Sequence, residues 1–218
     1  MSLLDELKSN PLLRPIKPLA RRFADTADIA TRHLRSSMTP FALTRYDNLH
    51  LGCGPRKIEG WANVDLYGFG NITWDLRKPL PVKPRSIQFI YSEHFIEHIP
   101  RDAALKLMKN CRNLLTSDGV IRLSTPSLRR LAEDYVARKF PELPKETWNP
   151  TTLCSMVNEG MRSWGHQYLY DEEELALLLS QAGFSDLKRA EWGNSEHLQL
   201  RGLETRPYHG DIIIEARA

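Results

Sequence analysis

Short apolar runs alternate with helical stretches from Tyr46 to the end of the chain, and this alternation constrains the fold more than any other feature. Strands followed by helices in alternation are typical of a parallel sheet covered by helices. The predicted strands are residues 48–51, 62–66, 71–75, 87–92, 119–124, 184–192 and 211–216. No helix separates the last two, which predicts an antiparallel edge strand. We therefore expect an α/β fold with a doubly wound, seven-stranded, mostly parallel sheet.

Two stretches between these strands have helical periodicity, residues 101–115 and 172–182. The leucines of the second stretch form one apolar face, and Gly183 follows as a helix stop. Asp171, with Glu174 three residues later, predicts an N-cap with a capping box.

The chain divides into an N-terminal extension, residues 1–42, and a main domain, residues 43–218. The extension is rich in arginine, and its apolar residues recur at spacings of three and four, which predicts an amphipathic helix. This helix packs on the main domain or a second copy, or it lies on an anionic membrane surface. Residues 140–165 contain three prolines and fit no period, which predicts an insertion over the mouth of the sheet.

The composition narrows the class of protein. With 41% apolar and 26% charged residues, the chain is typical of a soluble globular protein, and a net charge of +3 is too small to indicate a nucleic-acid partner. Cys53, Cys111 and Cys154 form no CxxC pair, which favours reduced thiols in a cytoplasmic protein. No apolar run approaches the roughly 18 residues that cross a bilayer, and no secretory signal is visible. Peripheral membrane contact and homo-oligomerisation stay open.

A tight glycine turn follows the first predicted strand, within residues 49–54. Glycine permits the sharp turn and lets a ligand approach the backbone closely. A dinucleotide fingerprint needs a further glycine where Lys57 stands, which argues against NAD and a dehydrogenase. Asp65 ends the second predicted strand, where a carboxylate can bind both hydroxyls of a ribose. Asp75 ends the third, where it can accept an amine of adenine or cap a turn.

His94 follows the fourth predicted strand, at the edge where catalytic groups lie in open α/β sheets. With Glu97 and His98 it forms H-x-x-E-H, a pattern of some metallopeptidases. Zinc would need a third ligand that the sequence does not reveal, so Glu97 and His98 are predicted to be structural. For His94, a general base and an ordinary hydrogen-bond partner of the substrate both stay open. His166 is either functional or a core histidine.

Six segments, in this order, resemble motifs of the class I S-adenosylmethionine-dependent methyltransferases. They are the glycine motif 49–54, the ribose acid Asp65, the adenine-side pair Asp75 and Leu76, the "hLEH" stretch 92–98, the "LkpGG" turn 114–120 and the "LLeeAGF" stretch 175–184. The resemblance covers most of residues 46–218 and includes small bacterial enzymes that decorate glycans or secondary metabolites. Asn48 or His50 stands where the family usually has an acidic residue.

The resemblance implies a Rossmann-like fold, with S-adenosylmethionine as cofactor and S-adenosylhomocysteine as product. The cofactor contacts that it implies are Leu51, Gly52, Cys53, Gly54, Asp65, Leu66, Asp75, Leu76, Ser92 and Glu93. His94 and His166 are predicted to be catalytic. Arg201, Arg206 and His197 are predicted to contact the substrate, because arginine holds anionic groups, although an exposed salt-bridged loop is the alternative. No metal site is predicted.

The predicted function is O-methylation of a sugar or small metabolite. A hydroxyl acceptor needs a base near neutral pH, and a histidine can supply it. N-methylation is one alternative, since an amine needs only to be deprotonated before attack. A non-catalytic, cofactor-binding scaffold whose N-terminal helix is an interaction surface is another. Magnesium assistance to a sugar hydroxyl stays open.

Overall fold

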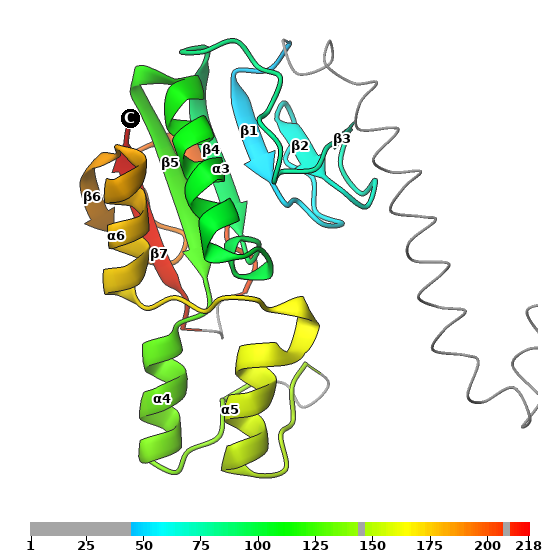
Figure 1. The fold of residues 1–218 in the computed structure, drawn as a ribbon, viewed down its shortest axis with the longest axis vertical. Coiled ribbons are helices and arrows are strands. Elements are labelled where there is room, and N and C mark those ends of the chain that lie inside the picture. Colours follow the sequence, from blue (N-terminus) through cyan, green and yellow to red (C-terminus); the bar gives the residue numbers. More distant parts are fainter. Residues whose placement is uncertain (1–44, 144–146, 207–209) are drawn as a thin grey trace, which may run out of the picture.

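The structure is a computed structural model that describes residues 45–143, 147–206 and 210–218 (Figure 1). Its strands are β1 (Asn48–Leu51), β2 (Ala62–Asp65), β3 (Ile72–Thr73), β4 (Ile87–Glu93), β5 (Leu115–Thr125), β6 (Ser185–Arg189) and β7 (Ile212–Arg217). They form one seven-stranded sheet in the order β3-β2-β1-β4-β5-β7-β6. The pairs among β1 to β5 are parallel, whereas β7 runs antiparallel to β5 and β6. The predicted α/β class and the antiparallel last strand are confirmed.

The prediction that β7 is an edge strand is wrong, because β7 lies between β5 and β6. Five of its six residues are buried in an unbroken run, as expected for a strand with neighbours on both sides. The five residues of β6 are mostly exposed and polar, which suits an edge.

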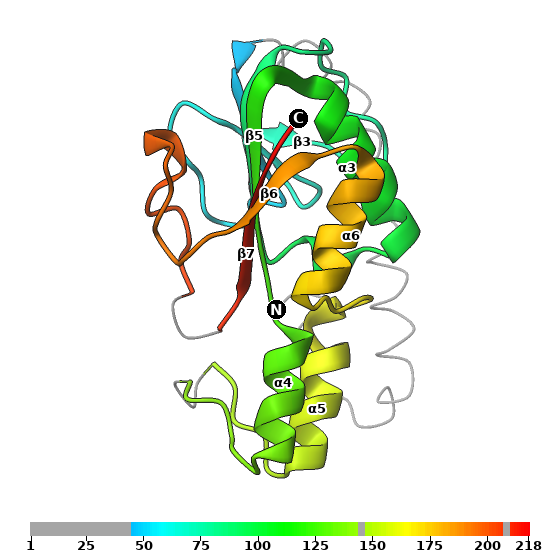
Figure 2. The same ribbon diagram turned by 90° about the vertical axis from the view of Figure 1, so that its left-hand side faces the viewer.

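Helices α3 (Arg101–Leu114) and α6 (Glu172–Ala182) cover one face of the sheet (Figures 1 and 2). The side chain of Asp171 accepts a hydrogen bond from the Glu174 amide, so the predicted N-cap is confirmed. The Glu174 carboxylate accepts from Arg101 Nε at 2.6 Å. Among the described residues it makes no hydrogen bond back to the Asp171 amide, so the predicted capping box is not formed. Gly183 ends α6 with a φ of 94°.

The opposite face carries the segment between β6 and β7, which includes the short helix η5 (Leu198–Leu200) (Figure 2). Leu200 and Leu203 pack there in an apolar cluster with residues of β4 and β5. Arg122 of β5 is fully buried. It pairs with Glu204 of this segment and with Glu215 of β7. This buried ionic network ties the segment to the sheet and so fixes the position of its C-terminal end.

Helices α4 (Leu128–Val136) and α5 (Leu153–Arg162) project beyond the C-terminal ends of the parallel strands (Figure 1). The prediction that residues 140–165 are irregular throughout is therefore wrong, and α4 was not predicted. Each helix buries only two residues, although both sequences are amphipathic. Thr152 and Ser155 form a capping box at the start of α5.

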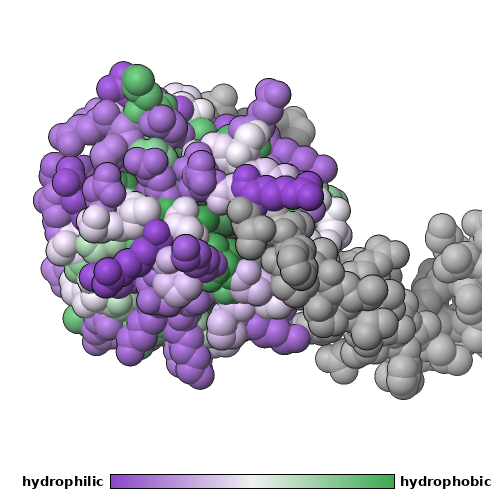
Figure 3. Space-filling model, turned by 90° about the horizontal axis from the view of Figure 1, so that it is seen from above, coloured by the Kyte–Doolittle hydropathy of each residue, from purple (hydrophilic) through white to green (hydrophobic). Residues whose placement is uncertain are grey.

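The end of the molecule away from α4 and α5 presents mainly hydrophilic side chains (Figure 3). Within the part of the chain that the structure describes, no helix has the length and hydrophobicity needed to span a bilayer. The amphipathic helix predicted in residues 1–42 lies outside the described residues and stays a prediction.

Candidate cofactor and acceptor site

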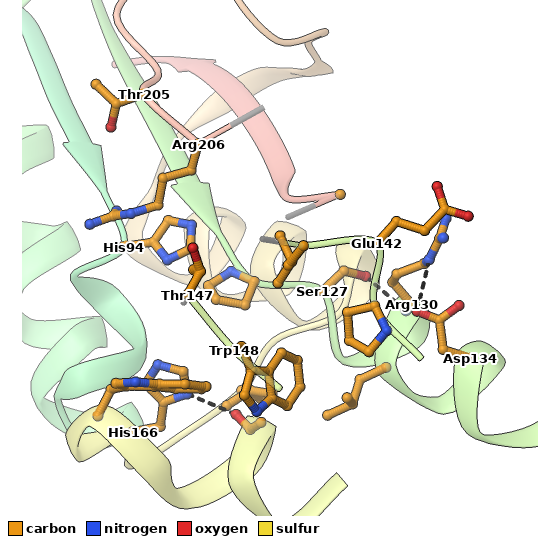
Figure 4. Close-up of a pocket in the computed structure, with 18 of the residues that line it drawn as sticks. His94, Ser127, Arg130, Asp134, Glu142, Thr147, Trp148, His166, Thr205 and Arg206 are labelled. Atoms are coloured by element: carbon orange, nitrogen blue, oxygen red, sulfur yellow. Dashed lines mark hydrogen bonds and ion pairs between the residues drawn. The ribbon is translucent and has the colours of Figure 1, made fainter. Parts of the chain in front are cut away.

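Two cavities adjoin one another at the C-terminal ends of the parallel strands. The first cavity, of about 690 Å³, lies against the turns that follow β1, β2 and β4. The second cavity, of about 790 Å³, lies between the sheet and the pair α4 and α5 (Figure 4). Five residues line both cavities: His94, His98, Trp164, Thr205 and Arg206. Ligands of open α/β sheets bind at this edge.

The glycine turn after β1 forms part of the wall of the first cavity. Gly52 has a φ of 62°, and a Cβ atom there would lie 2.4 Å from the Phe95 ring, so no other residue fits without displacing that ring. The Gly54 amide donates to Asp65 Oδ2 at 3.1 Å. Nothing lies within 4 Å of the Cβ position of Gly54, so a ligand can approach its backbone.

Asp65 is placed by the same turn. Its Oδ1 accepts from the Tyr67 amide at 2.6 Å, while Oδ2 accepts from Gly54, so both oxygens are held by backbone donors. Each carboxylate oxygen has a second lone pair. Asp65 lines the first cavity and can therefore accept two further hydrogen bonds from neighbouring hydroxyls.

Asp75 lines the first cavity and caps a turn, which is one of its two predicted roles, because its Oδ1 accepts from the Arg77 amide at 3.0 Å. Its two oxygens accept from Arg77 Nε and a terminal guanidinium nitrogen, each at 2.9 Å. This pairing raises the pKa of Arg77. The aromatic residues Tyr67, Phe69 and Trp74 line the same cavity and were not predicted. Their position within ten residues of Asp65 was the available signal for a flat ligand ring.

The remaining residues expected to contact the cofactor fall into two groups. Cys53, Leu66, Leu76 and Glu93 line the first cavity, together with Gly52, Gly54, Asp65 and Asp75. Leu51 and Ser92 do not line it. Leu51 is fully buried in the core, and Ser92 Oγ donates to the Leu51 carbonyl. Both carboxylate oxygens of Glu93 accept hydrogen bonds from Thr205, so Glu93 also anchors the segment before β7.

His94 stands between the two cavities. It has a φ of 49°, and its amide donates to the Ser124 carbonyl of β5. Its Nε2 lies 2.7 Å from Asp211 Oδ2, which also accepts from Ser124 Oγ. A carboxylate oxygen accepts hydrogen bonds, so Nε2 donates to Asp211, while Nδ1 lies 3.5 Å from Glu97 Oε1. Asp211 was not predicted, since it lies 117 residues from His94 in the sequence.

His98 and His166 face one another, with ring centroids 5.0 Å apart. His166 Nδ1 lies 2.8 Å from the Gly160 carbonyl of α5, which can only accept, so Nδ1 donates and Nε2 keeps its lone pair (Figure 4). Burial lowers the pKa of His98 to about 4 and also lowers the pKa of His166. Both rings are therefore neutral at pH 7. His166 lines only the second cavity.

The three residues expected to contact the substrate are separated in the structure. Arg206 lines both cavities and points toward His94 (Figure 4). Arg201 and His197 line neither. Arg201 donates to the Ser195 carbonyl, and the His197 ring lies 5.5 Å from that of Phe89 on the far face of the sheet. The alternation of loop and short helix in this segment, which sequence patterns do not resolve, directs these residues away from Arg206.

A family profile described as a methyltransferase domain matches residues 26–189 of the chain. The chain belongs to this methyltransferase family. A solved S-adenosylmethionine-dependent methyltransferase from Archaeoglobus fulgidus is 16% identical, with a TM-score of 0.47 over 88% of this chain and 94% of that chain. Another, from Mesorhizobium loti, is 15% identical, with a TM-score of 0.49 over 81% of this chain and 92% of that one. No curated protein is significantly similar to the chain.

The methyltransferase uses S-adenosylmethionine, and the first cavity fits this cofactor. The Gly54 position leaves open space beside the backbone, and Asp65 keeps lone pairs for the two ribose hydroxyls. Tyr67, Phe69 and Trp74 provide aromatic surface on the same wall. The cofactor, when bound, supplies an electrophilic methyl group, and a second molecule that receives it must lie in contact with the first cavity.

Proposed function

We propose that this methyltransferase transfers its methyl group to an oxygen of a sugar or other small metabolite that carries an anionic group. The observation that carries the proposal is the second cavity, which opens to the first through shared residues and is the size of a small-molecule site. An acceptor in the second cavity lies directly beside the cofactor.

The lining of the second cavity supports a polar acceptor. Arg206 and Arg130 offer guanidinium groups, and Ser127 and Thr147 offer hydroxyls (Figure 4). Arg130 is partly neutralised by Asp134, at 3.1 Å, so Arg206 is the stronger candidate for an anionic group. The indoles of Trp148 and Trp164 meet edge to face at 5.5 Å and provide flat surface for a ring.

We assign the base role to His94. Unlike His166, it lines both cavities, and the hydrogen bond between Nε2 and Asp211 orients its ring. His94 takes the proton of the acceptor hydroxyl, whose oxygen bonds to the methyl carbon while the carbon–sulfur bond breaks and its electron pair stays on sulfur. Asp211 stabilises the imidazolium that forms. His166 also lines the acceptor cavity, and its contact with the acceptor is a separate part of the proposal.

The three cysteines are free thiols, and two of them, Cys53 and Cys111, are buried, where burial raises the pKa of each to about 12. Unpaired cysteines favour a reducing compartment. We therefore place the enzyme in the cytoplasm. We also propose that it modifies glycans or natural products.

The test is formation of S-adenosylhomocysteine with a panel of sugar acids, hydroxy acids, phenols and amines. We expect turnover with hydroxyl compounds, and with the best acceptor we expect His94→Gln to lower kcat about 100-fold or more. His197→Gln is the matched control, since His197 lines neither cavity. Transfer to amines alone would overturn O-methylation, and a kcat within about threefold in His94→Gln would overturn the base. Cofactor binding without turnover on any acceptor would favour the scaffold.

A further inference from the structure

The fold brings a third possible metal ligand beside Glu97 and His98, the last two residues of the H-x-x-E-H pattern. His166, which lies after α5 and 68 positions beyond His98, brings its ring to the side of Glu97 and His98. One ligand atom of each of these three residues lies within 4.8 Å of the other two. His98 Nε2 is 3.8 Å from Glu97 Oε1.

We propose that Glu97, His98 and His166 bind a divalent transition-metal ion such as Zn²⁺ at the boundary of the two cavities. The donor set is two imidazole nitrogens and one carboxylate oxygen. Catalytic zinc sites use this set and keep a further position open. His98 lines both cavities and His166 lines the second, so the open position faces the acceptor.

Glu97 shows why a cation fits here. Its side chain is fully buried at the end of β4, in the short helix η3 (Ile96–His98). Oε2 accepts from Thr125 Oγ1 at 2.9 Å, but Oε1 has no hydrogen-bond partner among the described residues and only looser contacts with His94 Nδ1 at 3.5 Å and His98 Nε2 at 3.8 Å. A buried carboxylate oxygen without a hydrogen bond is costly, and burial raises the pKa of Glu97 accordingly. A cation bound to Oε1 removes this cost.

The two histidines are oriented as metal ligands are. A ligating imidazole commonly donates its other nitrogen to a backbone carbonyl, which fixes the tautomer and the ring. His166 donates Nδ1 to Gly160, and Nε2 keeps its lone pair. His98 places Nδ1 near Gly165 and Nε2 near Glu97.

The distances describe a site that contracts on binding. Ligand atoms about 2.1 Å from a tetrahedral Zn²⁺ lie roughly 3.4 Å from one another. The separations here are 3.8 Å for one pair and at most 4.8 Å for all. The ligand atoms therefore need to move closer by at most about 1.4 Å, which side-chain rotations can provide. That the cation orients an acceptor oxygen is a claim that rests on the proposed function. Binding of the cation itself does not depend on that function.

The test is calorimetric titration of metal-stripped, full-length protein with Zn²⁺ in the absence of cofactor and acceptor. We expect one site per chain, with affinity lowered about 100-fold or more in Glu97→Gln and in His166→Gln. His197→Gln removes one histidine outside both cavities and should bind Zn²⁺ as the wild type does. No binding by the wild type, or equal affinity in the Glu97 and His166 variants, would overturn the proposal.

A second measurement needs no variant and so does not depend on folding of the substituted proteins. Acylation of histidines by diethylpyrocarbonate, read by mass spectrometry, should be suppressed by Zn²⁺ at His98 and His166 and unchanged at His197. Equal acylation of all three with and without Zn²⁺ would overturn the proposal. Binding of S-adenosylhomocysteine, measured on the same samples, separates failure of the metal site from failure of the methyltransferase function.

Discussion

At the scale of single residues, the sequence predicted which residues lie at the ends of strands. Gly52, Gly54 and Asp65, which are predicted to contact the cofactor, line the first cavity, because each lies at the C-terminal end of a predicted strand or in the turn after it. Partnerships across the fold were not visible in the sequence. Asp211 reaches His94 because β7 inserts beside β5, and His166 reaches His98 after α5, a helix that was not predicted.

The free energy of unfolding should depend on pH through one buried residue, His50. It is buried beside Asn63, and burial lowers its pKa from 6.5 to about 4. Below pH 6.5 the unfolded chain takes up a proton that the folded chain excludes, so stability falls as the pH drops toward 4. His50→Gln should lack this component, and the difference in unfolding free energy between wild type and variant should change by about 2 kcal/mol between pH 7 and pH 5.

Urea denaturation of both proteins at the two pH values measures this change, since groups common to both cancel. The variant should lose less stability than the wild type on acidification. Parallel losses in the two proteins would show that His50 is not a buried neutral histidine.

At the scale of elements, apolar runs predicted the strands and the amphipathic patterns predicted α3 and α6. β1 has the predicted bounds, and α6 has both its bounds and its terminating glycine. The position of β7 within the sheet was predicted wrongly. Its unbroken run of buried residues is typical of a strand with neighbours on both sides. Helices α4 and α5 are amphipathic but were not predicted. Of the walls that they give the second cavity, only the part within residues 140–165 was predicted, and only as an insertion.

The network around Arg122 should stabilise the attachment of the segment before β7. Replacing Arg122 by Met leaves Glu204 and Glu215 buried without their partner, which should lower the unfolding free energy by about 3–5 kcal/mol. Arg189→Met is the matched control, because the pair of Arg189 with Glu172 is exposed on both sides and contributes about 1 kcal/mol or less. Denaturant unfolding compares the two. Similar losses in both variants would contradict a structural role for the buried network.

At the scale of the whole molecule, the fold places two cavities at one edge of the sheet and sets His94 and Arg206 between them. The class of fold, the methyltransferase family and the cofactor follow from ordered motifs in the sequence. The acceptor does not, because the second cavity is lined by residues far apart in the sequence that meet only in the folded chain. Binding of the cofactor in the first cavity is the claim on which the remaining proposals depend.

The most direct measurement of that claim is thermal unfolding of wild type and Asp65→Asn with S-adenosylhomocysteine and, separately, NAD. At about 100 times its dissociation constant, S-adenosylhomocysteine should stabilise the wild type by ~2.7 kcal/mol, or roughly 5–10 °C. NAD should give no shift, and Asp65→Asn should lose most of the response while Asp102→Asn, an exposed control on α3, keeps it. An equal shift in Asp65→Asn, or a shift with NAD alone, would contradict the assignment of the first cavity.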